Sequence, residues 1–385
     1  MSELASLGLV VVALAFAECA WWVRHGAVVL RVPLFFWGAS LATLSSSLGN
    51  ERGAFALQNP LPPFGRAYVL EPWPFSVGVD GVVSARAFSF GSEQRPAGPI
   101  RRFAWDEIEA LDRDDATLRV NGAPFATCGS RHHAEAALRV LQALEQAKPK
   151  DRAGTLDDLI AAHLDPDELL ERTARHRSLG AAPLIASVGL FLALFVAIPF
   201  EVAQRGLEQW PRLVLLLFAW VALTALSTWM AHRGLYGKRG DTLGATRGER
   251  WGQLVLMFLA PYTALRANDR LGRNLLAGLH PMAGALALAR PDRGHDAVLR
   301  GLRDLHTPRA LALDAAGLAI EADFRARLLH AAKKRAEGRG VDVAALARAP
   351  ELRAGQAAWC PRCLVRYRQA GGNCADCGVA LSSAT

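Results

Sequence analysis

The chain has 385 residues, of which 51% are hydrophobic and 21% are charged, and its mean hydropathy is +0.15. These values exclude a disordered chain and are too apolar for a typical soluble protein, so membrane segments are expected. Lysine and arginine number 44 and acidic residues 36, which leaves a net charge of +8. Six cysteines are too few for a disulfide framework, and four of them lie in the last 26 residues, which favours a local metal site.

The first apolar run covers residues 5–23 and contains one charged residue, Glu18. Its length is close to the roughly 20 residues that cross the core of a bilayer. Glu3 precedes the run and Arg24 follows it, which reverses the charge order of a cleaved secretory signal. Residues 1–26 are therefore predicted to form a transmembrane anchor with its N-terminus outside the cell.

Two further apolar runs, residues 179–200 and 213–231, are separated by a short linker without net charge. Both outer flanks of this pair are cationic, and the cations are Arg172, Arg175, Arg177, Arg233, Lys238, Arg239, Arg247 and Arg250. The positive-inside rule places the linker outside and both flanks in the cytoplasm. We therefore predict a transmembrane hairpin over residues 179–231.

Three shorter apolar stretches are ambiguous with respect to the membrane: residues 27–48, 253–265 and 275–289. If residues 27–48 crossed the bilayer, the arginines before the hairpin would lie on its outer side, so a non-spanning interpretation is favoured. Each of the other two stretches is shorter than about 17 residues and contains a proline, which favours buried or interfacial helices.

The segment 75–147 changes to the alternating pattern of β-strands. Apolar residues alternate on both sides of an Asp80-Gly81 turn, which predicts a β-hairpin. Further strands are predicted over residues 100–103, 117–120 and 124–128, and Ser130 is expected to cap a helix with one apolar face. The predicted fold class is mixed: membrane helices, a small antiparallel sheet closed by a C-terminal helix, and further helices.

The apolar positions of this segment resemble the pleckstrin-homology-like (PH-like) domains of bacterial membrane proteins. The positions that carry the resemblance are Phe103, Trp105, Ile108, Leu111, Leu118, Val120 and Phe125. The resemblance implies a PH-like domain over residues 27–147 that offers a surface to lipid headgroups or to a protein. Residues 75–147 hold eight arginines and ten acidic residues, so a cytoplasmic protein partner is favoured over an anionic headgroup. Trp105, Ile108, Leu118 and Phe125 are predicted to be buried.

A helical linker is predicted over residues 148–178, with Asp165 as a capping residue and Pro166 in the first helical position. The basic helical region over residues 232–358 follows the hairpin. Residues 232–359 hold 21 cationic and 12 acidic side chains, an excess that favours contact with the anionic inner face of the bilayer. Nucleic-acid binding is the alternative, and it is not favoured because no recognition motif accompanies the charge.

The most specific motif is the pair Cys360-Pro361-Arg362-Cys363 and Cys374-Ala375-Asp376-Cys377, with ten residues between. Two such turns supply the tetrahedral sulfur set that Zn²⁺ prefers, and they look like a short bacterial zinc ribbon over residues 359–385. The predicted ligands are Cys360, Cys363, Cys374 and Cys377. Four thiolates leave no open position on the metal, so a structural zinc is expected.

Iron in a rubredoxin-like site, two disulfides and a redox pair are the alternatives at these cysteines. A cytoplasmic location disfavours both of the oxidised alternatives. Arg362, Arg366 and Arg368 are expected to surround the site and to offset its negative charge.

No signature of a zinc protease, a serine hydrolase, a phosphate-binding loop or a dinucleotide-binding loop is present, so no enzyme activity is expected. The bias toward arginine, alanine and leucine is typical of a GC-rich bacterial genome, which indicates a bacterial inner-membrane protein. The expected function is that of a membrane-anchored adaptor or assembly factor that recruits a cytoplasmic partner through the PH-like domain and the zinc ribbon. A membrane-tethered regulator that contacts nucleic acid, and a small pore or transporter subunit, are the alternatives.

Overall fold

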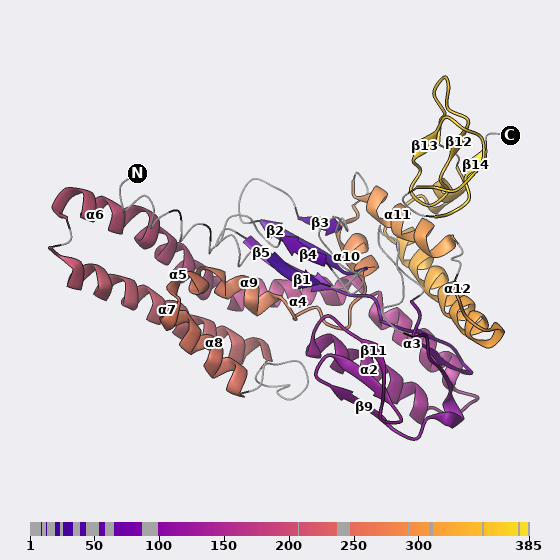
Figure 1. The fold of residues 1–385 in the computed structure, drawn as a ribbon, viewed down its shortest axis with the longest axis horizontal. Coiled ribbons are helices and arrows are strands. Elements are labelled where there is room, and N and C mark those ends of the chain that lie inside the picture. Colours follow the sequence, from indigo (N-terminus) through magenta and orange to yellow (C-terminus); the bar gives the residue numbers. More distant parts are fainter. Residues whose placement is uncertain are drawn as a thin grey trace.

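Among the described residues, short antiparallel strands predominate in the N-terminal third and helices in the remainder, as Figure 1 shows for the computed structural model. The structure describes residues 9, 13, 20–23, 26–33, 39–43, 54–57, 65–86, 99–206, 208–236, 247–290, 293–307, 311–348, 350–375 and 378–383. A helical hairpin projects from one end of the molecule and a small ribbon from the other, with the remaining strands and helices between them (Figure 1).

Two small antiparallel sheets begin the described chain, one of them with the order β3-β2-β5 and the other a pairing of β1 with β4. Alternate residues of β2 and β5 face two different apolar clusters. Val28 and Tyr68 belong to the main core, whereas Val29 and Val69 belong to a smaller cluster, so both faces of the sheet are covered. The strands are β1 Ala20–Val23, β2 Val28–Pro33, β3 Ser40–Thr43, β4 Ala54–Leu57 and β5 Gly65–Leu70.

These strands decide two of the predictions about the membrane. The non-spanning interpretation of residues 27–48 is confirmed for their described parts, because β2 and β3 pair with each other in a sheet. The predicted first span, residues 5–23, lies outside the described residues except for Leu9, Ala13 and its last four residues. Those four residues form β1 and pair with β4, so the prediction of a helix up to residue 23 is wrong. Tryptophan and valine favour a strand where a partner strand is at hand.

The predicted hairpin around Asp80-Gly81 is confirmed, and a third strand completes a sheet with the order β6-β7-β8. A Cβ atom on Gly81 would overlap the carbonyl oxygen of Phe103 on β8, so the close approach of β7 and β8 requires glycine there. The third strand begins two residues later than expected. The strands are β6 Ser76–Val77, β7 Gly81–Val83 and β8 Arg102–Ala104.

A second meander, β9-β10-β11, follows, and its turn residues Asn121 and Gly122 have φ values of 52° and 75°. Positive φ at both positions suits the type I′ turn of a tight hairpin. Strand β9 was not predicted, because its polar residues, two of them aspartates, do not show an alternation of apolar and polar side chains. Ser130 caps α2 as predicted, since its hydroxyl oxygen accepts the amide N–H of His133. The elements are β9 Leu111–Asp114, β10 Thr117–Val120, β11 Ala123–Thr127 and α2 Arg131–Gln146.

One apolar core joins these strands to helices from the C-terminal half of the chain. Trp73 lies at its centre and stacks on His163, Phe324 and Phe75, with ring centroids 4.3, 5.6 and 6.0 Å away. The helices and 3₁₀ turns of this part are η2 Trp105–Glu107, α3 Arg152–His163, α4 Pro166–Leu179, α9 Ala267–Gly272, α10 Pro281–Leu288, α11 His295–His306, α12 Ala315–Glu337 and η5 Val343–Ala347. Helices α3 and α4 correspond to the predicted linker, and Asp165 caps α4 as expected.

The four predicted core residues Trp105, Ile108, Leu118 and Phe125 are all buried. The indole N–H of Trp105 donates to the carbonyl oxygen of Gly78 at 3.0 Å. Replacing Trp105 with alanine should therefore lower the free energy of unfolding of the full chain by about 3–5 kcal/mol, the usual range for a buried aromatic side chain. Chemical denaturation in mild detergent measures this change. Trp251→Ala is the control, because that side chain is exposed.

Two helical segments among the described residues are long and apolar enough to cross a membrane, with mean hydropathies of 2.5 and 2.1. The first, Ala181–Arg205, comprises α5 Ala181–Leu192, the π-helical turn η3 Ala193–Ala197 and α6 Ile198–Arg205. The second, α7 Trp210–Tyr236, lies beside the first as a hairpin (Figure 1). Only 33% and 28% of the two apolar windows are buried, and the exposed side chains include Ile185, Leu192, Phe200, Leu215 and Leu226.

The two ambiguous stretches after the hairpin form short helices. Helix α8 Arg247–Leu259 packs on α7, where Phe258 stacks on Phe218 with ring centroids 6.3 Å apart, and the turn η4 Pro261–Arg266 follows it. Helix α8 also exposes Trp251, Val255 and Leu259. Helix α10, by contrast, is buried along most of its length. The second stretch thus contributes a buried helix, as its length predicted, and the first contributes a helix with an exposed apolar face.

Candidate metal centre

The C-terminal segment folds into a three-stranded antiparallel ribbon with the order β13-β12-β14. The strands are β12 Ala358–Trp359, β13 Arg366–Tyr367 and β14 Ser382–Ser383. Strands of two residues bury little apolar surface, so their backbone pairing alone cannot hold this segment together. The cysteine-containing turns between the strands therefore decide its stability.

The first turn follows β12 and carries Cys360 and Cys363. The amide N–H of Cys360 donates to the carbonyl oxygen of Val365 at 2.9 Å, and the amide N–H of Leu364 donates to the carbonyl oxygen of Cys360 at 2.9 Å. Leu364 has a φ of 61°, a left-handed conformation that is uncommon for a branched side chain. The turn thus holds its backbone in a strained conformation directly after the second cysteine.

The second turn repeats the hydrogen bonds of the first at the same spacing. The amide N–H of Cys374 donates to the carbonyl oxygen of Val379 at 2.8 Å, and that of Gly378 donates to the carbonyl oxygen of Cys374 at 2.9 Å. Gly378 has a φ of 66° and occupies the place that Leu364 has in the first turn. The residue before it, Cys377, lies outside the described residues, so its assignment as the fourth ligand stays a prediction.

The two turns bring three of the four predicted ligands together. The ligand atoms of Cys360, Cys363 and Cys374 all lie within 4.8 Å of one another, and the Sγ atoms of Cys363 and Cys374 are 3.6 Å apart. That separation is too long for a disulfide bond and is close to the roughly 3.8 Å edge of a tetrahedral zinc–thiolate site with 2.3 Å bonds. These three cysteines could therefore hold a metal ion.

Polar contacts around the sulfur atoms complete the site. The hydroxyl group of Tyr367 donates to Cys374 Sγ at 3.1 Å, and the amide N–H of Ala375 donates to the Tyr367 oxygen at 3.2 Å. The hydrogen bond to Cys374 raises the pKa of Tyr367 to about 12. Cys360 and Cys374 are buried, whereas Cys363 is half-buried. Donors directed at thiolate sulfur are the usual outer contacts of a metal site.

Arg362 forms an ion pair with the main core that no sequence pattern predicts. Its side chain is 8% exposed and points to α11, where its Nε donates to Asp304 Oδ1 at 2.5 Å and a second guanidinium nitrogen also pairs with Asp304. The charge of Arg362 is thus paired with Asp304, and this ion pair attaches the ribbon to the core. Arg366 and Arg368 are exposed on the surface of the ribbon.

Two buried histidines, His163 and His280, contact each other although no local sequence pattern pairs them. The rings of His163 at the end of α3 and His280 at the start of α10 are 5.0 Å apart. His163 Nδ1 donates to the carbonyl oxygen of Gly278 at 2.6 Å. Burial lowers the pKa of His163 to about 4, and it lowers the pKa of His280 as well. The residues are 117 positions apart in the sequence, so no local pattern could have revealed their contact.

The lowered pKa of His163 predicts a loss of stability in acid. The unfolded chain binds a proton at this residue below about pH 6.5, whereas the folded chain does so only below about pH 4. The free energy of unfolding should therefore fall by about 3 kcal/mol as the pH is lowered from 6.5 to 4. Denaturant titrations of the wild type and of His163→Gln across this range measure the effect. The variant should show a smaller fall, and equal slopes in both proteins would contradict the assignment.

Comparison of the chain with protein-family models, with curated proteins and with solved structures gives no match in any of the three. Function is therefore inferred from the residues of this chain and their geometry.

Proposed function

We propose that this chain is a membrane-anchored adaptor that holds a zinc ribbon in the cytoplasm as a binding module for a protein partner. The observation that carries the proposal is the buried ion pair between Arg362 of the ribbon and Asp304 of α11. Helix α11 belongs to the main core through Val298, Leu302 and Leu305, and the same core reaches α4 through Leu169. Helix α4 leads directly into α5, so the ribbon is held at a fixed place relative to the hairpin, at the opposite end of the molecule (Figure 1).

The membrane part of the proposal rests on the helical hairpin of α5, α6 and α7. Strands from before the hairpin and helices from after it share one apolar core, which supports placing both flanks on the same side of a membrane. The cationic residues of those flanks favour the cytoplasmic side. Apolar side chains exposed along both helices would face lipid, where their exposure has no cost. We infer that the short turn between α6 and α7 lies outside the cell and that the C-terminus lies inside.

Reporter fusions test this orientation. Fusions at Gly49, Gln209 and Thr385 should report inside, outside and inside. Gly49 lies in the sequence between β3 and β4, and Thr385 follows the ribbon, so both belong to the proposed cytoplasmic part. Gln209 lies between α6 and α7, on the proposed outer side. With residues 20–23 in β1, only residues 5–19 of the first apolar run remain, fewer than the roughly 17 that cross a bilayer, so no span is proposed there. An outside signal at Gly49, or matching signals at Gln209 and Thr385, would contradict the proposed arrangement.

The metal proposal is one structural zinc bound by Cys360, Cys363, Cys374 and Cys377. Its support is the hydrogen-bond pattern of the first turn, which recurs at the same spacing between the described residues of the second. By that repetition Cys377 corresponds to Cys363, whose sulfur is already within reach of Cys374. A bound zinc ion would cross-link the two turns without offering a site for substrate.

The partner is proposed to bind the ribbon because one face of the proposed PH-like sheet is covered. Helix α12 packs on the β6-β7 hairpin, where Ile320 forms a cluster with Val83 and Ala85. Antiparallel strands followed by α2 support a PH-like interpretation of residues 27–147, but α12 removes one of its candidate binding surfaces. The ribbon instead exposes Val365, Arg366 and Arg368. An apolar side chain beside two cations suits an acidic protein surface.

Site-specific crosslinking tests the proposed function. A photoreactive amino acid at Arg368, introduced in cells that express the full chain, should yield a protein adduct of defined mass. The same amino acid at Glu145, which is exposed on α2, is the control and should not yield that adduct. The Arg368 adduct should disappear when Cys374 is replaced with serine. Adducts shared by both positions would contradict a partner at the ribbon, and a nucleic-acid adduct would favour the membrane-tethered regulator.

A further inference from the structure

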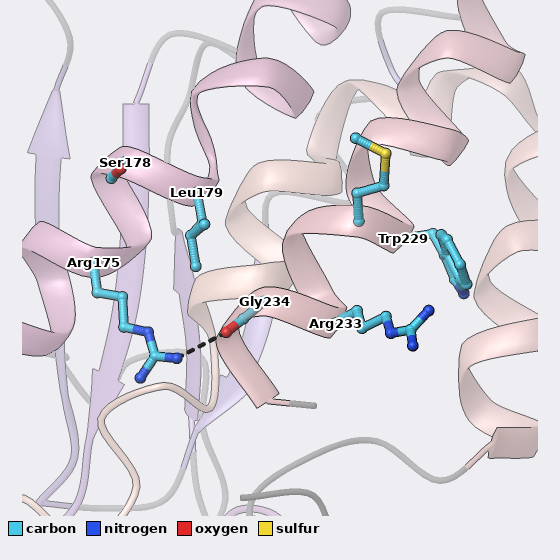
Figure 2. Close-up of a pocket in the computed structure, with 7 residues that line it drawn as sticks. Arg175, Ser178, Leu179, Trp229, Arg233 and Gly234 are labelled. Carbon is cyan, nitrogen blue, oxygen red and sulfur yellow. Dashed lines mark hydrogen bonds between the residues drawn. The ribbon is translucent and has the colours of Figure 1, made fainter. Parts of the chain in front are cut away.

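The base of the helical hairpin, where α4 passes into α5 and α7 ends, carries arginine side chains. Arg175 donates to the carbonyl oxygen of Gly234 at 2.8 Å, as the dashed line in Figure 2 marks. The guanidinium carbon of Arg233 lies 5.7 Å from the centroid of the Trp229 ring. Arginine and tryptophan are typical of the boundary between a bilayer and water, so this base marks the cytoplasmic edge of the proposed membrane part.

Helix α8 lies beside the half of α7 that is nearer to the core, and its end is far from this base (Figure 1). Phe258, near the end of α8, stacks on Phe218 with ring centroids 6.3 Å apart. Phe218 precedes Arg233 by 15 residues, which is about 22 Å along the axis of α7. The end of α8 therefore reaches at least the middle of a bilayer core that is about 30 Å thick.

The chain turns after α8 and returns to the base of the hairpin. The turn η4 packs on α5, where the hydroxyl group of Ser187 donates to the carbonyl oxygen of Ala264 at 3.1 Å. Helix α9 then reaches the last residue of α7, because the hydroxyl group of Tyr236 donates to the carbonyl oxygen of Leu271 at 2.7 Å. The segment 247–272 thus runs along the hairpin and comes back without passing its other end.

The turn between α8 and α9 has its backbone paired inside the protein. The amide N–H of Ala260 donates to the carbonyl oxygen of Leu256, and that of Thr263 donates to the carbonyl oxygen of Ala260, both at 2.8 Å. Pro261 has no amide N–H that needs a partner. Residues 263–266 are buried. Irregular backbone is tolerated at membrane depth only where protein covers it in this way.

The sequence of this segment is uncharged over the part that lies deepest. Residues 251–265 contain no charged residue, whereas Arg250 precedes them and Arg266 follows them. Arg266 is buried and pairs with Asp269 at 2.9 Å. A helix that lies flat on a membrane surface needs a strongly polar face toward water. The absence of charge over residues 251–265 favours insertion instead.

The exposed face of α8 is apolar and joins the exposed surface of the hairpin. Trp251, Val255 and Leu259 are 59, 52 and 79% exposed, and their spacing of four residues places them on one face of the helix. Phe258 is also exposed and contacts the exposed ring of Phe218 on α7. Water would make this exposure unfavourable, whereas the acyl chains that surround α7 would cover both helices.

We propose that residues 247–272 form a re-entrant membrane segment whose exposed face contacts the acyl chains of the bilayer. Helix α8 enters beside α7 from the cytoplasmic side, the chain turns at Pro261, and η4 and α9 lead it back to the core. The inference rests on the proposed location of the hairpin in a membrane, to which it adds a segment that enters the bilayer without crossing it. Because α9 also packs on β5, the segment connects the main core to the lipid.

Depth-dependent fluorescence quenching of the full chain in phosphatidylcholine vesicles tests the proposal. A fluorescent amino acid that absorbs at longer wavelengths than tryptophan replaces one exposed residue at a time. Bromine atoms are placed on the lipid either near the headgroup or near the end of the acyl chains. At Leu259 the ratio of chain-end quenching to headgroup quenching should exceed one, because the end of α8 lies near the middle of the bilayer.

Three exposed positions outside α8 are the matched controls. Leu223 on α7 lies 10 residues before Arg233 and should give a ratio above one, like Leu259. Met230 on α7 lies three residues before Arg233 and should give a ratio below one. Leu318 on α12 is far from the hairpin and should not be quenched by either lipid (Figure 1).

The controls separate failure of this inference from failure of the proposed membrane location. If Leu223 and Met230 give equal ratios or are not quenched, the hairpin does not lie in the membrane as proposed. If α7 gives the expected gradient but Leu259 matches Met230, α8 lies at the membrane surface and the re-entrant segment is excluded. If Leu259 instead matches Leu318, no lipid covers this face, and the proposal is overturned as well.

Photocrosslinking identifies the occupant of the exposed face directly. A photoreactive amino acid at Leu259 of the full chain in vesicles should give an adduct with the mass of one phospholipid, and the same amino acid at Leu318 should not. An adduct between two chains at Leu259 would assign the face to a second copy and overturn the proposal.

Discussion

Replacing Cys374 with serine is expected to release the metal and to unfold the ribbon while the hairpin and the main core stay folded. The ribbon spans about 25 residues and has strands of only two residues, so its apolar surface cannot stabilise it alone. Metal binding in comparable zinc peptides contributes of order 10 kcal/mol at neutral pH, which exceeds any other single contribution to this segment. Loss of one sulfur ligand should therefore cost most of the stability of the ribbon.

Elemental analysis of the purified full chain measures this effect, with about one zinc per chain expected for the wild type. Cys377→Ser should lower the zinc content as Cys374→Ser does, which tests the fourth ligand. Cys128→Ser is the control, since this buried cysteine follows β11 and lies outside the ribbon. Full zinc occupancy in Cys374→Ser would exclude the proposed ligand set, and iron in place of zinc would correct the identity of the metal.

Replacing Arg362 with alanine should detach the ribbon from α11 without releasing its metal. The change leaves the carboxylate of Asp304 buried without the guanidinium that faces it, and such a loss typically costs about 3–5 kcal/mol. Because arginine is not a metal ligand and Arg362 pairs with Asp304, the sulfur atoms are expected to keep their positions. Docking of the ribbon and folding of the ribbon should thus separate in this variant.

Hydrogen exchange distinguishes the two processes. In Arg362→Ala, protection should fall in α11 and around residues 350–357, while the zinc content stays at the wild-type value. Arg366→Ala is the matched control, because Arg366 is exposed on the same ribbon. The double variant Arg362→Leu, Asp304→Leu should recover part of the loss, since paired apolar groups can replace a buried ion pair. Unchanged protection in Arg362→Ala would show that the ion pair does not hold the ribbon.

The adaptor proposal makes the same variant informative about function. If the fixed position of the ribbon matters for recruitment, Arg362→Ala should weaken the Arg368 crosslink while membrane insertion stays intact. If the ribbon acts as an independent module, the crosslink should survive in that variant and disappear only in Cys374→Ser.

The sequence by itself determined the features that depend on neighbouring residues. The hairpin at Asp80-Gly81, the caps at Ser130 and Asp165, and the cysteine turns are specified by a few adjacent positions. Length and hydropathy identified the two candidate membrane helices in the same way. Each of these features depends on backbone preferences, hydrogen bonds or apolar length within one short segment, so a local pattern was sufficient to predict it.

Only the tertiary structure decided which of these segments meet. The pairing of β1 with β4 ended the first apolar run as a strand, because hydrogen bonds to a distant partner outweigh a local preference for helix. Arg362 and Asp304 are 58 residues apart, and their ion pair attaches the ribbon to the core. The contact of His163 with His280 arises in the same way. Such contacts depend on how the packed core arranges separate elements. The residues next to each partner in the sequence do not determine that arrangement, so a local pattern cannot predict the contact.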